Sequence, residues 1–444
     1  MFKNDLKKTI HLSLPMIVGQ IGQLTMSVAD NIMVGRVGTD TLAAAAIGNA
    51  LFTLVLVVGF GISMAITPLT AMAAGAGREK DCGVVLRQGL IVNLLSGVVL
   101  CGLTFIGAES IRFLNQPQTI VAPAILYMKV LGFSMLPLML FQSFRQFAEG
   151  VSFLKPAMVI TLLANLVNIL VNWVFIYGNC GAPALGLTGA GIATFSSRTF
   201  MALCLMWIIM TAPSLKRFDP SFRYRKIDIP MMKQLLKIGI PGAFQYFFEV
   251  SAFTVSSVIV GWMGSQALAA HQIALNLASI SFMGAMGISA AGTIRVSNAV
   301  GRGDTRDVRA AGFSAALVCA GFMAMAGLVF ILFRNYLPWL YVSDSVVVEM
   351  SAALLVMVAF FQISDGIQVV GLGILRGITD MKIPTLITLV AYWIIGLPSG
   401  YVLAFHFGLG IYGVWYGLLI SLSASALLMM LRFHVKTDHS KSSG

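Results

Sequence analysis

The stretch VGRVGTDTLAAAAI, residues 34–47, recurs in the second half of the chain and decides the fold. Residues 260–273 read VGWMGSQALAAHQI, so seven of the fourteen positions are identical at a shift of 226 residues. Chance would give roughly one or two identities over this length in so apolar a chain. The same shift aligns Pro15 with Pro241. The sequence therefore contains two related halves, and each half is expected to fold as the same unit.

Composition places both halves in a membrane. Hydrophobic residues make up 58% of the 444 residues and charged residues only 10%, whereas a soluble domain carries roughly 25% charged residues. Lys3, Lys7 and Lys8 form a short basic tail that leads directly into an apolar run, so we expect no cleavable signal peptide. The five cysteines are odd in number and lack CxxC spacing. We interpret them as buried apolar side chains, and we expect neither a structural metal nor a cofactor.

Long apolar runs predict the transmembrane helices. A helix needs about 20 mainly apolar residues to cross the hydrocarbon core of a bilayer. Twelve runs reach this length, near residues 12–35, 42–73, 84–110, 121–147, 156–178, 187–211, 237–262, 266–299, 310–333, 346–374, 384–406 and 409–432. The fold class that follows is an all-α polytopic membrane protein with twelve transmembrane helices.

The repeat predicts how the two halves are oriented. Each half holds six spans, an even number, so both halves enter the membrane from the same side and form six-helix lobes related by a parallel internal repeat. We place the N-lobe at residues 1–213, a polar cytoplasmic linker at 214–236, and the C-lobe with a short cytoplasmic tail at 237–444. Two such lobes with a cavity between them would suit alternating access.

Basic residues predict the topology. The loops on one side of the predicted membrane hold only Arg36, Arg112 and Arg334. By the positive-inside rule the other side is cytoplasmic, and both termini lie there. The net charge of +12 follows from this topology, and no clustered, base-reading basic face indicates nucleic-acid binding. The basic residues on the cytoplasmic side are Lys3, Lys7, Lys8, Arg78, Lys80, Arg87, Lys155, the cluster at 216–237, Arg295, Arg302, Arg306, Arg309, Arg376, Lys382, Arg432, Lys436 and Lys441.

Three carboxylates interrupt the apolar runs, namely Asp30, Glu249 and Asp365. An ionisable residue at the centre of a membrane helix costs about 2.5–3.5 kcal/mol on insertion scales, so such residues mark ion or substrate pathways. Under the 226-residue shift, Asp30 aligns with Ser256 and Glu249 with Gln23. The scaffold is repeated while the charges are specific to each lobe. Three acids on three spans predict ion-coupled transport.

Other polar residues within the spans have more than one interpretation. Asn168 and Asn172 are four residues apart, which places them on one face of a helix. A helix-to-helix polar contact and a ligand site explain these asparagines equally well. Arg145 and Arg198 are near the predicted cytoplasmic ends of their spans, and we interpret them as structural residues or as side chains that reach the membrane surface.

Several segments resemble a known family of transporters. The chain is similar to the multidrug and toxic compound extrusion (MATE) family, within its NorM-like bacterial branch, over about residues 8–433. The acid-bearing segments are the more specific part of this resemblance. The segments that carry it are Pro15 with VADNIMVGRVG (28–38), FFEVSAF (247–253), GSQALAAHQIALN (264–276) and SDGIQVVGLGILRGITD (364–380).

The resemblance implies roles for individual residues. Asp30 matches the first-helix acid of the N-lobe, Glu249 the seventh-helix acid and Asp365 the tenth-helix acid. Relatives often have a tyrosine four residues before the tenth-helix acid, where this chain has Phe361. That departure removes one possible cation ligand. The polar partners that the resemblance implies for Asp30 are Asn168, Asn172 and Thr194.

The expected chemistry is the exchange of cations. Carboxylates are oxygen ligands that suit Na⁺, and burial disfavours their charged form enough for proton exchange as well. The resemblance implies a secondary active transporter of the bacterial cytoplasmic (inner) membrane. It would export organic, mainly cationic compounds in exchange for Na⁺ or H⁺, with Na⁺ favoured for the paired acids of the C-lobe. We expect a monomer without enzymatic activity. Adaptable apolar and aromatic side chains that could line its substrate cavity are Tyr246, Phe248, Phe282, Met286 and Phe361, with Phe247, Met283 and Phe360 as further candidates.

Other function classes fit the sequence less well. A nucleotide-driven pump would need a Gly-x-x-x-x-Gly-Lys-[Ser/Thr] motif, which the sequence lacks. The main alternative is a lipid-linked oligosaccharide flippase of a related multi-helix type. Such a flippase would be expected to carry several basic residues in its central cavity to hold pyrophosphate, whereas the central charges here are acidic. A channel is a weaker alternative, because two repeated lobes suit a rocking motion better than a fixed pore.

Overall fold

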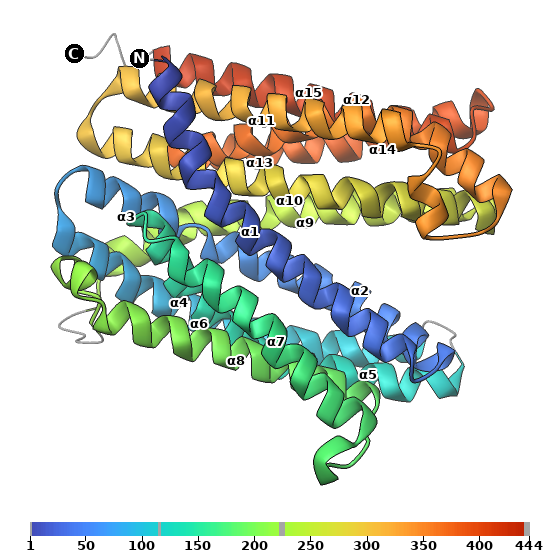
Figure 1. Cartoon of the computed structure of the whole chain (residues 1–444). Helices are drawn as coiled ribbons and strands as arrows, with labels where there is room; N and C mark the ends of the chain where they lie inside the picture. Colours follow the sequence, from blue (N-terminus) through green and yellow to red (C-terminus); the bar gives the residue numbers. More distant parts are fainter. Residues whose placement is uncertain (1, 114–116, 222–226, 439–444) are drawn as a thin grey trace. The chain divides into compact units, whose positions relative to one another are not determined.

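A computed structural model describes residues 2–113, 117–221 and 227–438 of the chain. Over these ranges the chain forms helices and loops without a β-strand, and twelve helical segments are long and apolar enough to cross a membrane (Figure 1). Each segment overlaps one of the twelve predicted spans, so the predicted all-α class and the twelve transmembrane helices are confirmed. Part of the predicted linker, at 222–226, and Lys441 of the predicted tail lie outside the described residues.

The first six spans use eight α-helices, because two spans are interrupted. The second span breaks at Met64 and Ala65, and the fourth at Ser134, and in both the chain continues in the same span after the break. The helices are α1 (Phe2–Gly35), α2 (Thr39–Ser63), α3 (Ile66–Gly75), α4 (Glu79–Ser110), α5 (Gln118–Phe133), α6 (Met135–Gly150), α7 (Lys155–Tyr177) and α8 (Leu187–Thr211).

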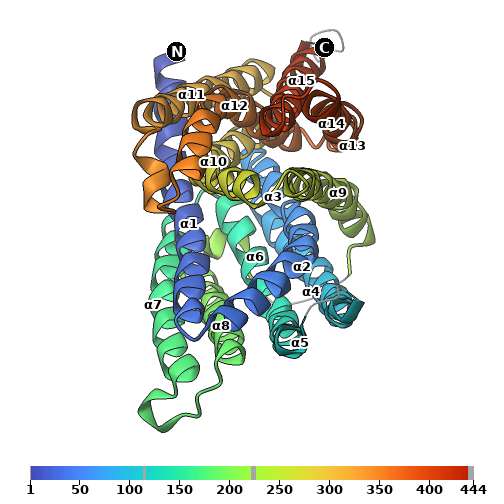
Figure 2. The same cartoon turned by 90° about the vertical axis from the view of Figure 1, so that its right-hand side faces the viewer.

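The last six spans include one with π-helical turns. In the eleventh span, π-helical segments at Val390–Gly396 and Val402–His406 follow α13 and α14. Such turns are rare and are often found near functional sites. Within this half, α12 packs against α10, α11 and α15 (Figure 2). The helices are α9 (Ile229–Gly261), α10 (Ser265–Arg302), α11 (Thr305–Phe333), α12 (Ser345–Gly377), α13 (Lys382–Leu389), α14 (Leu397–Tyr401) and α15 (Ile411–Asp438).

Polar caps and a glycine define helix ends between the spans. Gly303 follows α10 with a φ of 71°, a left-handed conformation that glycine adopts without steric cost. The next residue, Asp304, starts α11 by accepting a hydrogen bond from the Asp307 backbone N–H at 3.0 Å. Asp344 starts α12 in the same way and accepts from the Val346 N–H at 2.9 Å. These caps satisfy backbone N–H groups at the starts of α11 and α12.

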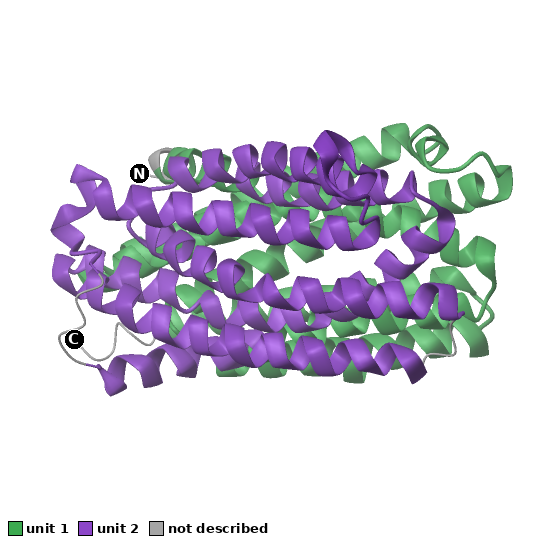
Figure 3. Ribbon diagram, turned by 90° about the horizontal axis from the view of Figure 1, so that it is seen from below, with its two compact units in different colours: residues 1–17, 244–444 green, residues 18–243 purple. Residues whose placement is uncertain are grey.

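The described chain forms two compact units (Figure 3). Unit 1 comprises residues 1–17 and 244–444, and unit 2 comprises residues 18–243. Helix α1 therefore begins in unit 1 and continues into unit 2, while α9 begins in unit 2 and continues into unit 1. The N-lobe and C-lobe boundaries predicted from the repeat place the whole of α1 in the first lobe, and they stay a prediction. In the structure, the described residues 2–17 of α1 belong to unit 1.

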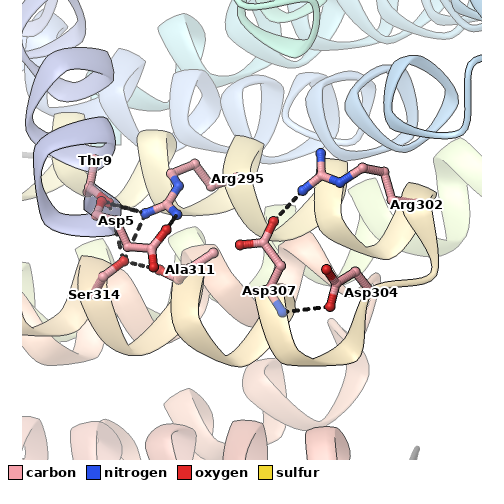
Figure 4. Close-up of polar contacts among 8 residues, drawn as sticks. All are labelled: Asp5, Thr9, Arg295, Arg302, Asp304, Asp307, Ala311 and Ser314. Atoms are coloured by element: carbon pink, nitrogen blue, oxygen red, sulfur yellow. Dashed lines mark hydrogen bonds and ion pairs between the residues drawn. The ribbon is translucent and has the colours of Figure 1, made fainter. Parts of the chain in front are cut away.

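A buried ion pair holds the start of α1 within unit 1 (Figure 4). Arg295 of α10 donates from Nη2 to Asp5 Oδ1 at 2.7 Å, and both side chains are 8% exposed. Its Nη1 also donates to the Thr9 hydroxyl at 2.6 Å and to the Ser314 hydroxyl of α11 at 2.9 Å. A buried charge is costly unless it is paired and hydrogen-bonded, and Arg295 meets both conditions. The cluster joins three helices of unit 1.

The internal repeat is visible in the packing inside each unit. In unit 2 the Thr67 hydroxyl of α3 donates to the Gln146 carbonyl oxygen of α6 at 3.0 Å. In unit 1 the Thr293 hydroxyl of α10 donates to the Gly373 carbonyl oxygen of α12 at 2.8 Å. Thr67 and Thr293 are equivalent under the 226-residue shift. Both halves thus use the same small hydroxyl residue to join neighbouring helices, as is common in membrane proteins.

The close approach of α10 and α12 depends on Gly373, and we expect Gly373→Ala to destabilise the protein. An added Cβ would lie 2.3 Å from Ser289 Oγ and 2.7 Å from the Ser289 carbonyl oxygen, so the helices would have to separate. Overpacking of this kind costs typically about 1–3 kcal/mol. The matched control is Gly321→Ala on α11, where a Cβ meets nothing within 4 Å. In thermal unfolding of the purified proteins, Gly373→Ala should have a lower midpoint temperature than the wild type, and Gly321→Ala should not. Equal midpoints for the two variants would contradict the prediction.

Candidate functional site

Unit 1 brings two of the predicted acids together. Glu249 lies on α9 and Asp365 on α12, and their side chains are only 6% and 4% exposed. The two carboxyl groups are close enough to interact electrostatically. Since like charges repel strongly in a poorly solvated environment, a bound cation or proton would relieve this repulsion.

Amide side chains surround Glu249. Gln245, one turn earlier on α9, donates from Nε2 to Glu249 Oε2 at 2.6 Å. The opposite end of this amide, Gln245 Oε1, is buried and has no hydrogen-bond partner among the described residues. On α12, the Gln368 carbonyl oxygen accepts a hydrogen bond from the Tyr392 hydroxyl at 3.3 Å. Tyr392 belongs to the π-helical segment of the eleventh span. The site therefore combines two buried carboxylates with amide and hydroxyl groups, and one buried amide oxygen has no hydrogen-bond partner among the described residues.

A basic residue also reaches this site. The Arg376 guanidinium lies 5.8 Å from the centre of the Tyr246 ring, within range of a cation–π interaction. It also interacts electrostatically with Glu249. Arg376 was expected among the basic residues on the cytoplasmic side, and its side chain is buried in unit 1. Burial of the side chain does not test on which side of the membrane Arg376 lies, so its place on the cytoplasmic side stays a prediction.

The predicted cavity-wall residues have different surroundings. Phe361 is 3% exposed, and its ring centroid lies 5.6 Å from that of Trp415, inside a hydrophobic core cluster. Met286 Sδ lies 3.9 Å from the Tyr246 hydroxyl. Phe248 and Phe282 are partly exposed. Contact of these side chains with a substrate stays a prediction.

The third acid, Asp30, lies in unit 2 with the partners that the family resemblance implied. Asn172 of α7 donates from Nδ2 to Asp30 Oδ1 at 2.6 Å, and the Thr194 hydroxyl of α8 lies 3.3 Å from Asp30 Oδ2. Asn172 Nδ2 also lies 3.1 Å from Asn168 Oδ1. Asn172 Oδ1 is buried and has no hydrogen-bond partner among the described residues. Residues from two helices, α7 and α8, thus converge on the carboxylate of α1.

Two further residues near Asp30 were not identified from the sequence as part of a site. Tyr127 of α5 donates to Asn49 Oδ1 at 3.2 Å and interacts electrostatically with Asp30. Arg198 of α8 also interacts with Asp30 electrostatically. It was expected near a helix end, but it lies well inside α8, four residues after Thr194. This i, i+4 spacing is the signal that could have linked Arg198 to the acid.

The described residues do not suggest a bound metal cofactor. No group of three or more His, Cys, Asp or Glu side chains in these ranges could hold a metal ion. Each acid site instead pairs carboxylate oxygens with amide or hydroxyl groups. Such donor sets suit a monovalent cation or a proton that binds reversibly.

Comparison with known proteins gives a consistent family assignment. The family model described as MatE matches residues 15–174 and 241–402, so it matches both halves of the repeat. A probable multidrug resistance protein NorM from Mesorhizobium japonicum is 34% identical over 440 residues, covering 98% of this chain and 94% of that protein. The multidrug resistance protein MdtK from Yersinia pseudotuberculosis is 35% identical over 433 residues, covering 96% of this chain and 95% of that protein.

Solved structures share the fold at lower sequence identity. The eukaryotic MATE transporter AtDTX14 superposes with a TM-score of 0.89 at 21% identity and 99% coverage of both chains. A multidrug resistance MATE family transporter of the MOP superfamily, in an outward-facing conformation, superposes with a TM-score of 0.91 at 20% identity, covering 98% of this chain and 97% of that one. These likenesses extend over nearly the whole chain.

Proposed function

Since the chain belongs to the MatE family, we propose that it is a secondary active efflux transporter that exchanges organic cations for Na⁺ by alternating access. Relatives at 34–35% identity are named multidrug resistance proteins, which supports export of several compounds rather than one. The chain is a multi-pass membrane protein with twelve spans. We place it in the bacterial cytoplasmic membrane as a monomer with both termini in the cytoplasm.

The buried pair of Glu249 and Asp365 is the observation that carries this proposal. Two buried carboxylates on different helices of unit 1 are close enough to interact electrostatically. Such an arrangement is unfavourable while both acids are ionised and unoccupied, and binding a cation removes the penalty. The free energy of cation binding can then favour one conformation of the transporter over another.

We favour Na⁺ over H⁺ as the coupling ion because of the neutral oxygens near the pair. Na⁺ must exchange its hydration shell for several protein oxygens, whereas a proton needs only one acceptor. Gln245 Oε1 is buried without a hydrogen-bond partner among the described residues, and it is available for this purpose. Phe361 offers no hydroxyl one turn before Asp365, so the remaining ligands must come from the carboxylates, amides and backbone. Asp30 is a second cation-binding acid, with Asn168, Asn172 and Thr194 as its partners.

The exported compounds are expected to be apolar cations. A carboxylate in a weakly polar site attracts a positive charge, and aromatic rings and methionines adapt to different shapes. Tyr246 and Met286 lie next to each other in unit 1 and are the first candidates for substrate contact.

The coupling ion can be tested by imposing each gradient separately. Proteoliposomes containing the purified protein should move a fluorescent cationic dye against its gradient when an inward-directed Na⁺ gradient is the energy source. A proton gradient alone in Na⁺-free medium should give much slower movement. Equal rates under the two gradients would overturn the Na⁺ assignment. Dye movement that ignores both gradients would overturn ion-coupled export itself.

A further inference from the structure

The eleventh span contains a π-helical turn that lies just before a proline. In the segment Val390–Gly396, the Tyr392 carbonyl oxygen accepts a hydrogen bond from the Leu397 N–H, five residues later. The next residue, Pro398, has no N–H and cannot continue the hydrogen bonds of a regular α-helix. π-Helical turns are rare and are often found at functional sites. The side chains of this turn contact both helices that carry the acids of unit 1.

Trp393 joins the π-helical turn to α9. Its indole Nε1 donates to the backbone carbonyl oxygen of Phe248 at 3.1 Å. Phe248 directly precedes Glu249. The indole N–H is a donor only, so it holds the backbone of α9 and cannot itself bind a cation. A side chain of the eleventh span is thus attached to α9 at the residue next to the acid.

Tyr392, the residue before Trp393, joins the same turn to α12. Its hydroxyl donates to Gln368 Oε1 at 3.3 Å, and Gln368 follows Asp365 by three residues. The Tyr392 side chain is 1% exposed, so this contact is shielded from water. Two consecutive residues of the π-helical turn therefore hold different acid-bearing helices.

Aromatic rings join the same three elements. The ring centroid of Tyr392 lies 5.9 Å from that of Phe253 on α9, and the Phe253 centroid lies 6.3 Å from that of Phe361 on α12. Phe253 follows Glu249 by four residues, and Phe361 precedes Asp365 by four. Each ring is thus about one helical turn from an acid. Helices α9 and α12 are neighbours at this level, and the eleventh span contacts both of them.

We propose that Tyr392 and Trp393 are positioning residues of the cation site, which set the spacing between Glu249 on α9 and Asp365 on α12. A binding site keeps its affinity only while its ligands are held within narrow limits by residues around them. Trp393 fixes the backbone beside one acid, and Tyr392 fixes the helix that carries the other. This inference rests on the proposed cation-coupled function and adds the residues that support its site.

Equilibrium binding of ²²Na⁺ to the purified protein tests the role of Trp393. Trp393→Phe keeps an aromatic ring but removes the N–H that reaches Phe248. This variant should bind Na⁺ about tenfold more weakly than the wild type, at the lower end of the losses seen when an outer partner of a metal ligand is removed. The midpoint of thermal unfolding without Na⁺ should change little, because the ring still packs in the eleventh span.

The matched control is Ser251→Ala on α9. The Ser251 hydroxyl lies 3.2 Å from the same Phe248 carbonyl oxygen, but it belongs to α9 itself. Its removal takes a hydrogen bond from that oxygen without separating two helices, so Na⁺ affinity should match the wild type. An equal loss of affinity in Ser251→Ala and Trp393→Phe would overturn the positioning role.

A double variant tests whether the two residues act on one spacing. Tyr392→Phe should also weaken Na⁺ binding about tenfold, because it releases α12 from the turn. If both contacts maintain the same spacing, the double variant should lose little more affinity than either single variant, whereas independent effects would multiply. If Trp393→Phe does not fold, Tyr392→Phe carries the test alone, with Tyr401→Phe at an exposed position of α14 as its control.

The results separate this inference from the proposed function. Wild-type protein that binds no Na⁺ would overturn the proposed function, and the positioning role with it. Wild-type protein that binds Na⁺, with unchanged affinity in Trp393→Phe or in Tyr392→Phe, would overturn the positioning role alone. Multiplied losses in the double variant would overturn the shared spacing.

Discussion

Glu249→Gln is expected to abolish gradient-driven dye efflux while leaving the protein folded in the membrane. The amide has nearly the same volume as the acid and keeps an oxygen that can accept the 2.6 Å hydrogen bond from Gln245. It loses the negative charge and the exchangeable proton. A carboxylate that couples transport to Na⁺ needs its negative charge, and one that couples transport to H⁺ needs its exchangeable proton. Efflux in proteoliposomes should therefore fall to the level of protein-free vesicles.

The matched control for this change is Glu349→Gln. Glu349 lies near the start of α12 and is exposed, so the same substitution there should leave efflux unchanged.

Asp365→Asn should reduce transport about as strongly as Glu249→Gln. Asp30→Asn should impair it less, because this change leaves the proposed cation site at Glu249 and Asp365 intact. If Glu249 were only a neutral, hydrogen-bonded acid, the amide would be tolerated, and wild-type efflux from well-folded Glu249→Gln protein would exclude a coupling role.

Arg295→Met is expected to produce the largest loss of stability among the substitutions considered. Removing the guanidinium leaves the Asp5 carboxylate buried without its counter-charge, and it also removes hydrogen bonds to Thr9 and Ser314. Breaking a buried ion pair by removing one partner typically costs about 3–5 kcal/mol. The start of α1 should then detach from unit 1, and the midpoint of thermal unfolding should fall by several degrees.

Arg302→Met provides a control on the same helix. Arg302 pairs with Asp307, but its side chain is 48% exposed (Figure 4). Exposed ion pairs contribute about 0–1 kcal/mol, so this variant should unfold near the wild-type temperature. The double variant Asp5→Asn, Arg295→Met should be less unstable than the sum of its single changes, because neither charge is then left unpaired. Equal melting of Arg295→Met and Arg302→Met would show that the buried pair does not anchor α1.

The sequence predicted the acids of the site better than it predicted their surroundings. Asp30, Glu249 and Asp365 stand out because a carboxylate within an apolar run is rare and costly. Gln245 could also have been found, since it precedes Glu249 by one helical turn. Tyr392 could not, because its contact with Gln368 depends on how a π-helical segment packs against α12.

The basic partners of the acids show the same limit. Counting Lys and Arg along the chain predicts which side of the membrane a loop occupies, because that rule depends on local charge alone. It does not predict that the Arg376 side chain is buried, and it does not place Arg198 in the interior of α8. Whether a guanidinium faces solvent or a neighbouring carboxylate depends on the rotation of its helix against others. That rotation is set by packing between residues far apart in the sequence.

Sequence alone determined the class of this protein, its twelve spans, the two related halves and the three acids. Each of these follows from local properties, namely the length of apolar runs, self-similarity at one shift, and rare charges within those runs. Tertiary structure alone decided that Asp5 pairs with Arg295, 290 residues away, so that α1 begins in unit 1 and continues into unit 2. It also decided that the Arg376 guanidinium lies near the Glu249 carboxylate. These features depend on burial and pairing between distant segments, whose energies arise only when the helices pack together.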